Sequence, residues 1–201
     1  MFSLCLCLDG LWVVGVDLAG SSRRVTGLCR MGFELAAELS KAYSDDEILA
    51  FVSRDIVNIV AIDAPLTYPG PGRRFRSCDA ELRRIGVKLF PPLLGPMKAL
   101  TRRGVKLREA LERRGYRVIE VFPTGARVFL GLPPKRAGRE ALREALSRLG
   151  VRGIPENADQ HLLDAVICAL IGLYYLKGEY VEFGSPEEGV IVMPKPRRRS
   201  T

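Results

Sequence analysis

Four carboxylates interrupt stretches of the chain that are otherwise apolar. Asp17 ends the run VVGVD, Asp63 ends VNIVAID, Glu120 lies within VIEVF, and Asp164 lies within HLLDAVICAL. Any one of these acids fits an exposed turn or a helix cap, which leaves its charge in water. Four such intrusions together indicate a shared cation site, because like charges about 3–5 Å apart are costly until a divalent metal neutralises them.

One histidine joins this set of acids. His161 precedes Asp164 by three residues, so the two side chains share one face of a helix. A lone histidine near a helix start is more often structural. Beside the acids, however, His161 is a candidate metal ligand or a group that orients an attacking water.

The elements that must position these residues alternate between strands and helices. Apolar runs predict strands at 11–19, 57–65 and 116–123, two more strands within 23–39, and a last edge strand at 187–196. Helices are expected at 44–54, 102–115, 138–150 and 157–178. Ser44 and Glu47 form a capping-box pattern, and Asn157 is the expected N-cap of the last helix. Parallel strands end at one edge of a sheet, where α/β proteins bind ligands.

Positive charge is concentrated in residues 73–117. This segment holds 14 lysines and arginines against four acidic residues, whereas the whole chain has a net charge of +8. Such a segment, which also contains Phe75 and Phe90, favours a polyanionic partner such as DNA or RNA. The alternative is a solvated helical face. The candidate nucleic-acid-binding residues are Arg73, Arg74, Arg76, Arg102, Arg103, Lys106 and Arg108.

Length and composition indicate one domain over residues 1–201, with a core at about 12–194 and a mobile basic tail at 195–201. No apolar run reaches the roughly 18 residues that span a bilayer, and the apolar start lacks the basic region of a signal peptide. Five scattered cysteines fit reduced core residues in a cytoplasmic protein. The scarcity of asparagine and glutamine is typical of a thermophilic source.

A family resemblance emerges from these motifs. The strand ending in Asp17, the strand reading IDAP, the strand reading IEVFP and the helix with HLLDAVICAL are similar to domain of unknown function 429, a family regarded as nucleases of ribonuclease H fold. The segment RRFRSCDAELRRIGVKLFPP is similar to the middle of that family, so the match covers residues 12–194. More distantly, Asp17 and the HLLD helix resemble RuvC-type resolvases, in which a first-strand Asp and a last-helix His or Asp hold metal.

The resemblance implies an α/β, ribonuclease H-like (RNase H-like) fold. Its five-stranded mixed sheet would be flanked by helices, with the first strand central and the strand of Asp63 beside it. In RuvC-like enzymes the second acid is a Glu at the end of the fourth strand. Here Asp63 takes that place and Glu120 lies one strand later, so the choice between these two ligands stays open.

The leading hypothesis is a metal-dependent nuclease that hydrolyses phosphodiester bonds of DNA or RNA. Mg²⁺ or Mn²⁺ suits a site made of carboxylates better than zinc does. Asp17 would bridge two ions, Asp164 and either Glu120 or Asp63 would each hold one ion, and His161 would assist. Two such ions stabilise both the attacking and the leaving oxygen.

Two other classes of function compete with this hypothesis. One is a noncatalytic nucleic-acid-binding protein whose acids are caps and turns. The other is an ATP-dependent phosphotransferase, because GVDLAGSS resembles the first phosphate loop of actin-like kinases. Such kinases need two halves of this kind, and this chain shows one. The sequence leaves the oligomeric state, monomer or homodimer, open.

Overall fold

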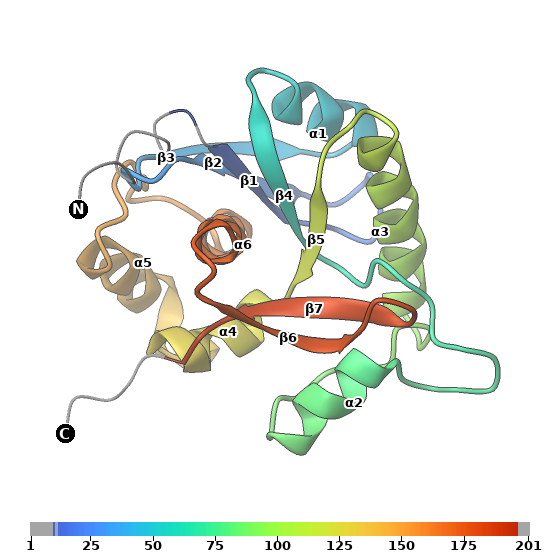
Figure 1. Cartoon of the computed structure of the whole chain (residues 1–201). Coiled ribbons are helices and arrows are strands. Elements are labelled where there is room, and N and C mark those ends of the chain that lie inside the picture. Colours follow the sequence, from blue (N-terminus) through green and yellow to red (C-terminus); the bar gives the residue numbers. More distant parts are fainter. Residues whose placement is uncertain (1–9, 11, 197–201) are drawn as a thin grey trace, which may run out of the picture.

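The computed structural model describes residue 10 and residues 12–196, arranged around one seven-stranded mixed sheet (Figure 1). The strands are β1 (Trp12–Asp17), β2 (Thr26–Met31), β3 (Ala37–Ala42), β4 (Val57–Asp63), β5 (Val118–Val121), β6 (Tyr180–Ser185) and β7 (Gly189–Pro194). The helices are α1 (Asp45–Val52), α2 (Ser77–Arg84), α3 (Met97–Glu112), α4 (Pro123–Leu130), α5 (Gly138–Arg148) and α6 (Gln160–Leu176), with a 3-10 turn, η1 (Lys135–Ala137). Most of the apolar start and most of the basic tail lie outside the described residues.

The strand order is β3-β2-β1-β4-β5-β7-β6. β1 pairs antiparallel with β2 and parallel with β4, and β5 continues the parallel set. The first strand is therefore central with the strand of Asp63 beside it, which confirms the α/β, RNase H-like fold. The expected strand count of five is wrong, because the hairpin of β6 and β7 extends the sheet beyond β5.

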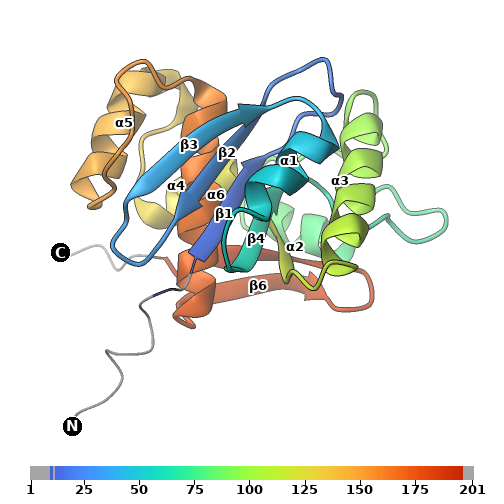
Figure 2. The ribbon, with the colours of Figure 1, turned by 90° about the horizontal axis from the view of Figure 1, so that it is seen from above.

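Helices cover both faces of the sheet (Figure 2). Residues of α4, α5 and α6 build the larger apolar core on one face, together with Val13, Ile59 and Ile119 from the strands. On the other face, α1 and α3 pack over Val14, Val60 and Ile62. The alternation of strand residues between the two cores follows from the two-residue period of a strand.

α6 lies unusually close to β1 and β2 because glycines face it. A Cβ built on Gly15 would stand 2.2 Å from the carbonyl oxygen of Ala165, and one built on Gly27 would stand 2.1 Å from that of His161. Only glycine permits so close an approach of two backbones. The helix that carries His161 and Asp164 is thus seated directly on the main chain of the sheet.

The ends and positions of the expected elements agree with the structure in part. α1 begins with the predicted capping box of Ser44 and Glu47. α6 begins later than expected, because Asp159 rather than Asn157 caps it by accepting a hydrogen bond from the N–H of Leu162. The strand expected at 187–196 is β7, which lies between β5 and β6 and is not at the edge.

The core also bears on the cysteine prediction. Cys29, Cys78 and Cys168 are buried and form no disulfide with one another, as expected of core residues; Cys5 and Cys7 lie outside the described residues. Among the described residues, no helix is both long enough and apolar enough to cross a membrane.

Candidate functional site

The register of the sheet places two of the predicted acids side by side. β1 and β4 run parallel, and Asp17 is paired with Asp63 at the last position of both strands. Neighbouring strands lie about 4.8 Å apart, and paired residues project to the same face. Both carboxylates therefore project from adjacent strand ends toward the face that α6 covers.

His161 completes a contact with the first of these acids. Its Nδ1 lies 2.6 Å from Oδ2 of Asp17, and the imidazole is 43% exposed whereas the carboxylate is 15% exposed. Gly27 lies opposite Asp17 in the β1–β2 pairing and contacts the backbone of His161, which lets the helix approach this closely. The hydrogen bond to Asp17 raises the pKa of His161 above its usual value of 6.5.

The surroundings of Asp63 disfavour its charged form more strongly than those of Asp17 do. Desolvation raises the pKa of Asp63 well above its usual range, and the carboxylates of Asp17 and Asp164 raise it further, while Lys135 lowers it. Desolvation likewise raises the pKa of Asp17 despite the hydrogen bond to His161. Among the described residues, no hydrogen-bond donor or cation within ion-pair distance holds the Asp63 carboxylate. It is a part-buried acid without a counter-ion of its own.

Asp164 reaches the same place from α6, but with cations already beside it. Nη2 of Arg127 donates a hydrogen bond of 2.7 Å to Oδ1 of Asp164, and both side chains are buried. Nζ of Lys135 lies 3.7 Å from Oδ2 of the same carboxylate. The structure thus gives Asp164 a buried ion pair that the sequence motif does not reveal.

Glu120 does not join the three aspartates. It pairs with Ile62, one residue before Asp63, so it projects to the opposite face of the sheet. There its carboxylate accepts hydrogen bonds of 2.7 and 2.6 Å from the two terminal nitrogens of Arg76, and 2.7 Å from the N–H of Leu66. All three interactions are inside the fold, so Glu120 is a counter-ion of Arg76 and lies apart from the pair of Asp17 and Asp63.

The fit of this group to a metal ion is partial. No set of three or more His, Cys, Asp or Glu side chains in the described ranges is arranged to hold an ion. Two of the four predicted acids are already paired with arginines, because Arg127 holds Asp164 and Arg76 holds Glu120. Asp17 and Asp63 still offer carboxylate oxygens from adjacent strand ends, and carboxylate oxygen is the donor that Mg²⁺ and Mn²⁺ prefer.

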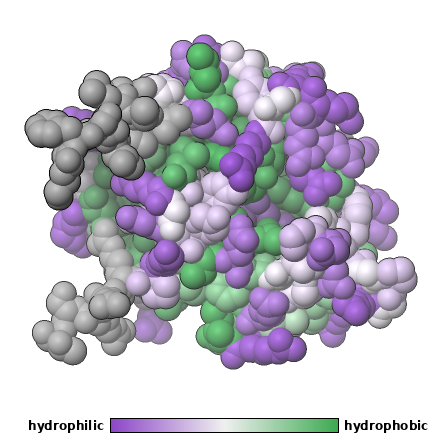
Figure 3. All heavy atoms as spheres, in the orientation of Figure 1, coloured by the Kyte–Doolittle hydropathy of each residue, from purple (hydrophilic) through white to green (hydrophobic). Residues whose placement is uncertain are grey.

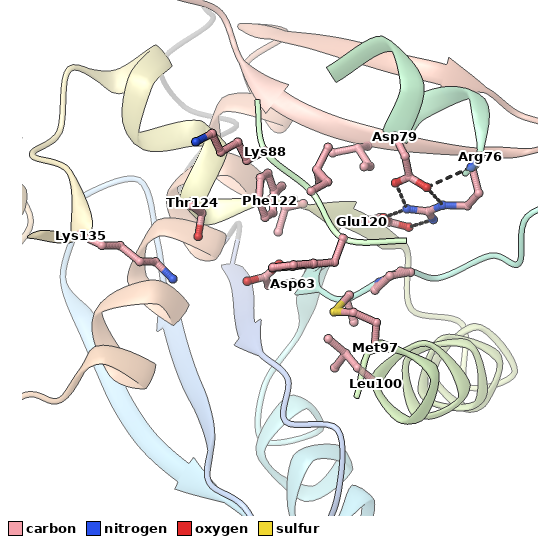
Figure 4. A pocket seen from close by; sticks show the side chains of 16 residues that line it. Asp63, Arg76, Asp79, Lys88, Met97, Leu100, Glu120, Phe122, Thr124 and Lys135 are labelled. Carbon is pink, nitrogen blue, oxygen red and sulfur yellow. Dashed lines mark hydrogen bonds and ion pairs between the residues drawn. The ribbon is translucent and has the colours of Figure 1, made fainter. Parts of the chain in front are cut away.

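A pocket of about 310 Å³ opens beside Asp63 (Figure 4). Figure 4 shows the side chain of Lys135 extended toward Asp63, with Thr124, at the start of α4, above the gap between them and Lys88 above Thr124. Arg76, Asp79 and Glu120 also line the pocket, but they are bonded to one another. The polar groups of the lining that no other lining residue binds are the Asp63 carboxylate, the Thr124 hydroxyl, the Lys88 ammonium and the Lys135 ammonium, of which the last also lies 3.7 Å from Asp164.

The predicted nucleic-acid-binding residues divide into buried and exposed groups. Arg76 and Arg103 are buried; Arg103 donates to Asp45 and to the carbonyl oxygens of Ala19 and Tyr43. These two guanidinium groups are bound within the fold, so they are corrected from phosphate ligands to structural residues. Counting charges along the sequence does not reveal that an arginine is buried.

The remaining predicted cations stay accessible to solvent to different extents. Arg102 and Lys106 are exposed on α3 and line a shallow hollow with Gly20 and Ser22, in the loop that follows Asp17. Arg74 is exposed, Arg73 forms an ion pair with Glu188, and Arg108 lies 3.5 Å from Glu112. Figure 3 shows hydrophilic residues gathered at the upper right of one face, where Figure 1 places α1 and α3.

Comparisons with known proteins place the chain in a family. A RuvC from Thermus thermophilus in complex with a Holliday junction substrate matches with a TM-score of 0.47 and 18% identity, over 84% of this chain and 96% of that one. A second T. thermophilus RuvC structure gives the same score and identity, over 83% and 96%. No curated protein matches. The family model described as "Protein of unknown function (DUF429)" matches residues 15–189, and the chain therefore belongs to the DUF429 family.

Proposed function

We propose that this protein is a divalent-metal-dependent hydrolase of phosphodiester bonds in nucleic acid, acting as a nuclease in the cytoplasm. The observation that carries the proposal is the pairing of Asp17 with Asp63 at adjacent strand ends, with Asp63 lacking any partner among the described residues. Two carboxylates that crowd each other in this way cost free energy unless a cation joins them. Asp164 adds a third carboxylate to the same region.

In this proposal Asp17 and Asp63 hold Mg²⁺ or Mn²⁺, in place of the Glu120 ligand that the sequence left open. The ion, when bound, supplies a water of lowered pKa and neutralises charge on the phosphate. His161 holds a proton at Nδ1 against Asp17 and thereby fixes the direction in which that carboxylate points. Lys135 and Thr124 line the route by which a phosphate reaches Asp63.

The experiment is a hydrolysis assay with end-labelled single-stranded and double-stranded oligonucleotides, in EDTA, Mg²⁺ and Mn²⁺. We expect cleavage with either ion, none in EDTA, and a kcat lower by a factor of about a hundred or more in Asp63→Asn, because a metal ligand cannot be replaced by an amide without loss of charge. Asp46→Asn, which alters an exposed carboxylate on α1, is the matched control. Cleavage that persists in EDTA, or that Asp63→Asn leaves unchanged, contradicts the proposal.

Nucleic-acid binding without hydrolysis is a second candidate function. The ion pairs of Asp164 with Arg127 and of Glu120 with Arg76 favour it, because they make two of the predicted acids structural. Both candidates use the exposed face of α3. Replacing Arg102 and Lys106 by alanine should lower affinity for all sequences and reduce the slope of log K against log salt by about one for each phosphate that the variant no longer neutralises. Arg148→Ala, at an exposed position of α5, is the control.

A further inference from the structure

The pocket beside Asp63 is larger than a phosphate needs. Its apolar walls are formed by Pro65, Leu89, Phe90, Met97, Leu100 and Phe122. The proposed hydrolysis uses only the end of the pocket at Asp63 and Lys135, so this apolar part has no role in that reaction.

The walls come from separate segments that meet at the carboxyl end of the sheet. Leu89 and Phe90 belong to the chain between α2 and α3, Met97 and Leu100 to the first turn of α3, and Phe122 to the residue before α4. Phe90 is 74% exposed, although a large aromatic side chain normally gains free energy by burial. An exposed aromatic ring at the mouth of an apolar pocket offers a stacking surface to a flat ligand.

The polar groups of the pocket define where a charge would sit. Arg76, Asp79 and Glu120 bind one another, so the donors that line the pocket for a ligand are Lys88, the Thr124 hydroxyl and Lys135, which also lies 3.7 Å from Asp164. Lys135 lies at the Asp63 end, as Figure 4 shows, and Lys88 is exposed at the outer part. This arrangement suits a ligand with a flat, apolar part for the pocket walls and an anionic part for the lysines. A nucleotide has both parts, since its base is flat and its phosphate is anionic.

We infer that the pocket binds the base of an unpaired nucleotide whose phosphate lies at Asp63. The inference rests on the proposed function and specifies its substrate as single-stranded nucleic acid, or a strand with an unpaired base. A volume of about 310 Å³ is at the lower end of the range for small-molecule sites and suits one nucleotide. A base held in a duplex is stacked on its neighbours, so it enters such a pocket only after it leaves the stack.

The test separates base binding from hydrolysis by using a ligand without phosphate. Isotope-labelled protein is titrated in EDTA with adenosine, and separately with ribose, while the amide resonances of Leu89 and Phe90 are followed by NMR. We expect saturable shifts with adenosine and none with ribose. Phe90→Ala should weaken adenosine binding about fivefold or more, since stacking on one aromatic ring accounts for at least that factor. Ile56→Ala, at an exposed residue before β4, should not change it.

Each outcome decides the inference. No adenosine binding, equal shifts with ribose, or unchanged affinity in Phe90→Ala would overturn it, whatever the hydrolysis assay shows, because the titration contains neither metal nor phosphodiester. With Mn²⁺ present, we further expect kcat/KM to be about tenfold higher or more on a single strand than on the same strand in a duplex, because a duplex base must first leave the stack. Equal values would exclude the single-strand preference and leave the proposed hydrolysis intact.

Discussion

Replacing Glu120 by glutamine distinguishes a metal ligand from a structural counter-ion. Glu120 is buried and accepts hydrogen bonds from both terminal nitrogens of Arg76 and from the N–H of Leu66. Glutamine preserves the shape and volume of the side chain, but it removes the charge and turns one acceptor oxygen into an amide donor. That donor would face either the guanidinium group or the backbone N–H.

The expected loss of stability follows from these contacts. Removing one partner of a buried ion pair costs about 3–5 kcal/mol, because it leaves the other charge uncompensated. Asp79 still accepts hydrogen bonds of 3.1 and 2.8 Å from Arg76 in the variant, which places the cost near the lower end, about 3 kcal/mol. For a chain of this length, that loss corresponds to a decrease of about 6–12 °C in Tm.

The assay is thermal and urea unfolding in EDTA, repeated with excess Mg²⁺. Glu112→Gln, at a half-exposed carboxylate on α3, is the control and should change Tm little. Arg76→Met should cost more than Glu120→Gln, because it leaves the carboxylates of both Glu120 and Asp79 without their buried counter-ion. If Glu120→Gln kept full stability in EDTA and lost the stabilisation by Mg²⁺, the reasoning would be refuted and Glu120 would be a metal ligand.

Three further predictions concern the face of the sheet that α6 covers. Asp164→Asn should lower the free energy of unfolding in EDTA by about 3 kcal/mol, because Arg127 loses a buried counter-ion; equal urea midpoints would contradict this. Asp17→Asn should lower the pKa of His161, the one histidine of the chain, in an NMR titration. In the parent, the contact between His161 and Asp17 should add to the free energy of unfolding below pH 6.5, and this contribution should disappear as pH rises through the raised pKa of His161. The stability of the variant should not show this pH-dependent decrease. Gly15→Ala should cost about 1–3 kcal/mol by overpacking against α6, measured by urea unfolding, and an unchanged midpoint would show that the helix can move away.

The sequence predicts the positions of the acids better than their partners. Apolar runs that end at Asp17 and Asp63 suffice to place both residues at strand ends, and the rule that parallel strands share an edge brings them together. Nothing in the sequence pattern, however, predicts the register in which two neighbouring strands pair. A shift of one residue decides which face a side chain occupies, and that shift separates Glu120 from Asp63.

The counter-ions could not be predicted because they come from distant parts of the chain. Arg76 is 44 residues from Glu120, and Arg127 is 37 residues from Asp164. Arg127 lies on α4, a helix that the sequence pattern did not predict because Pro123 indicates the end of a strand. The same proline also suits the first position of a helix, where its missing N–H costs nothing. One residue thus ends one element and begins the next.

Because α6 contacts β1 and β2 directly, the distances between the site residues do not depend on how well the apolar core is packed. The spacing between Asp17 and the helix that bears His161 and Asp164 depends on main-chain atoms touching at Gly15 and Gly27, not on the size of intervening side chains. Conservative changes elsewhere in the larger core can therefore alter the melting temperature without moving these groups apart. Substitutions among apolar core residues therefore leave the spacing of these groups unchanged. A single methyl group added at Gly15 or Gly27 instead changes both the stability and the spacing of the site.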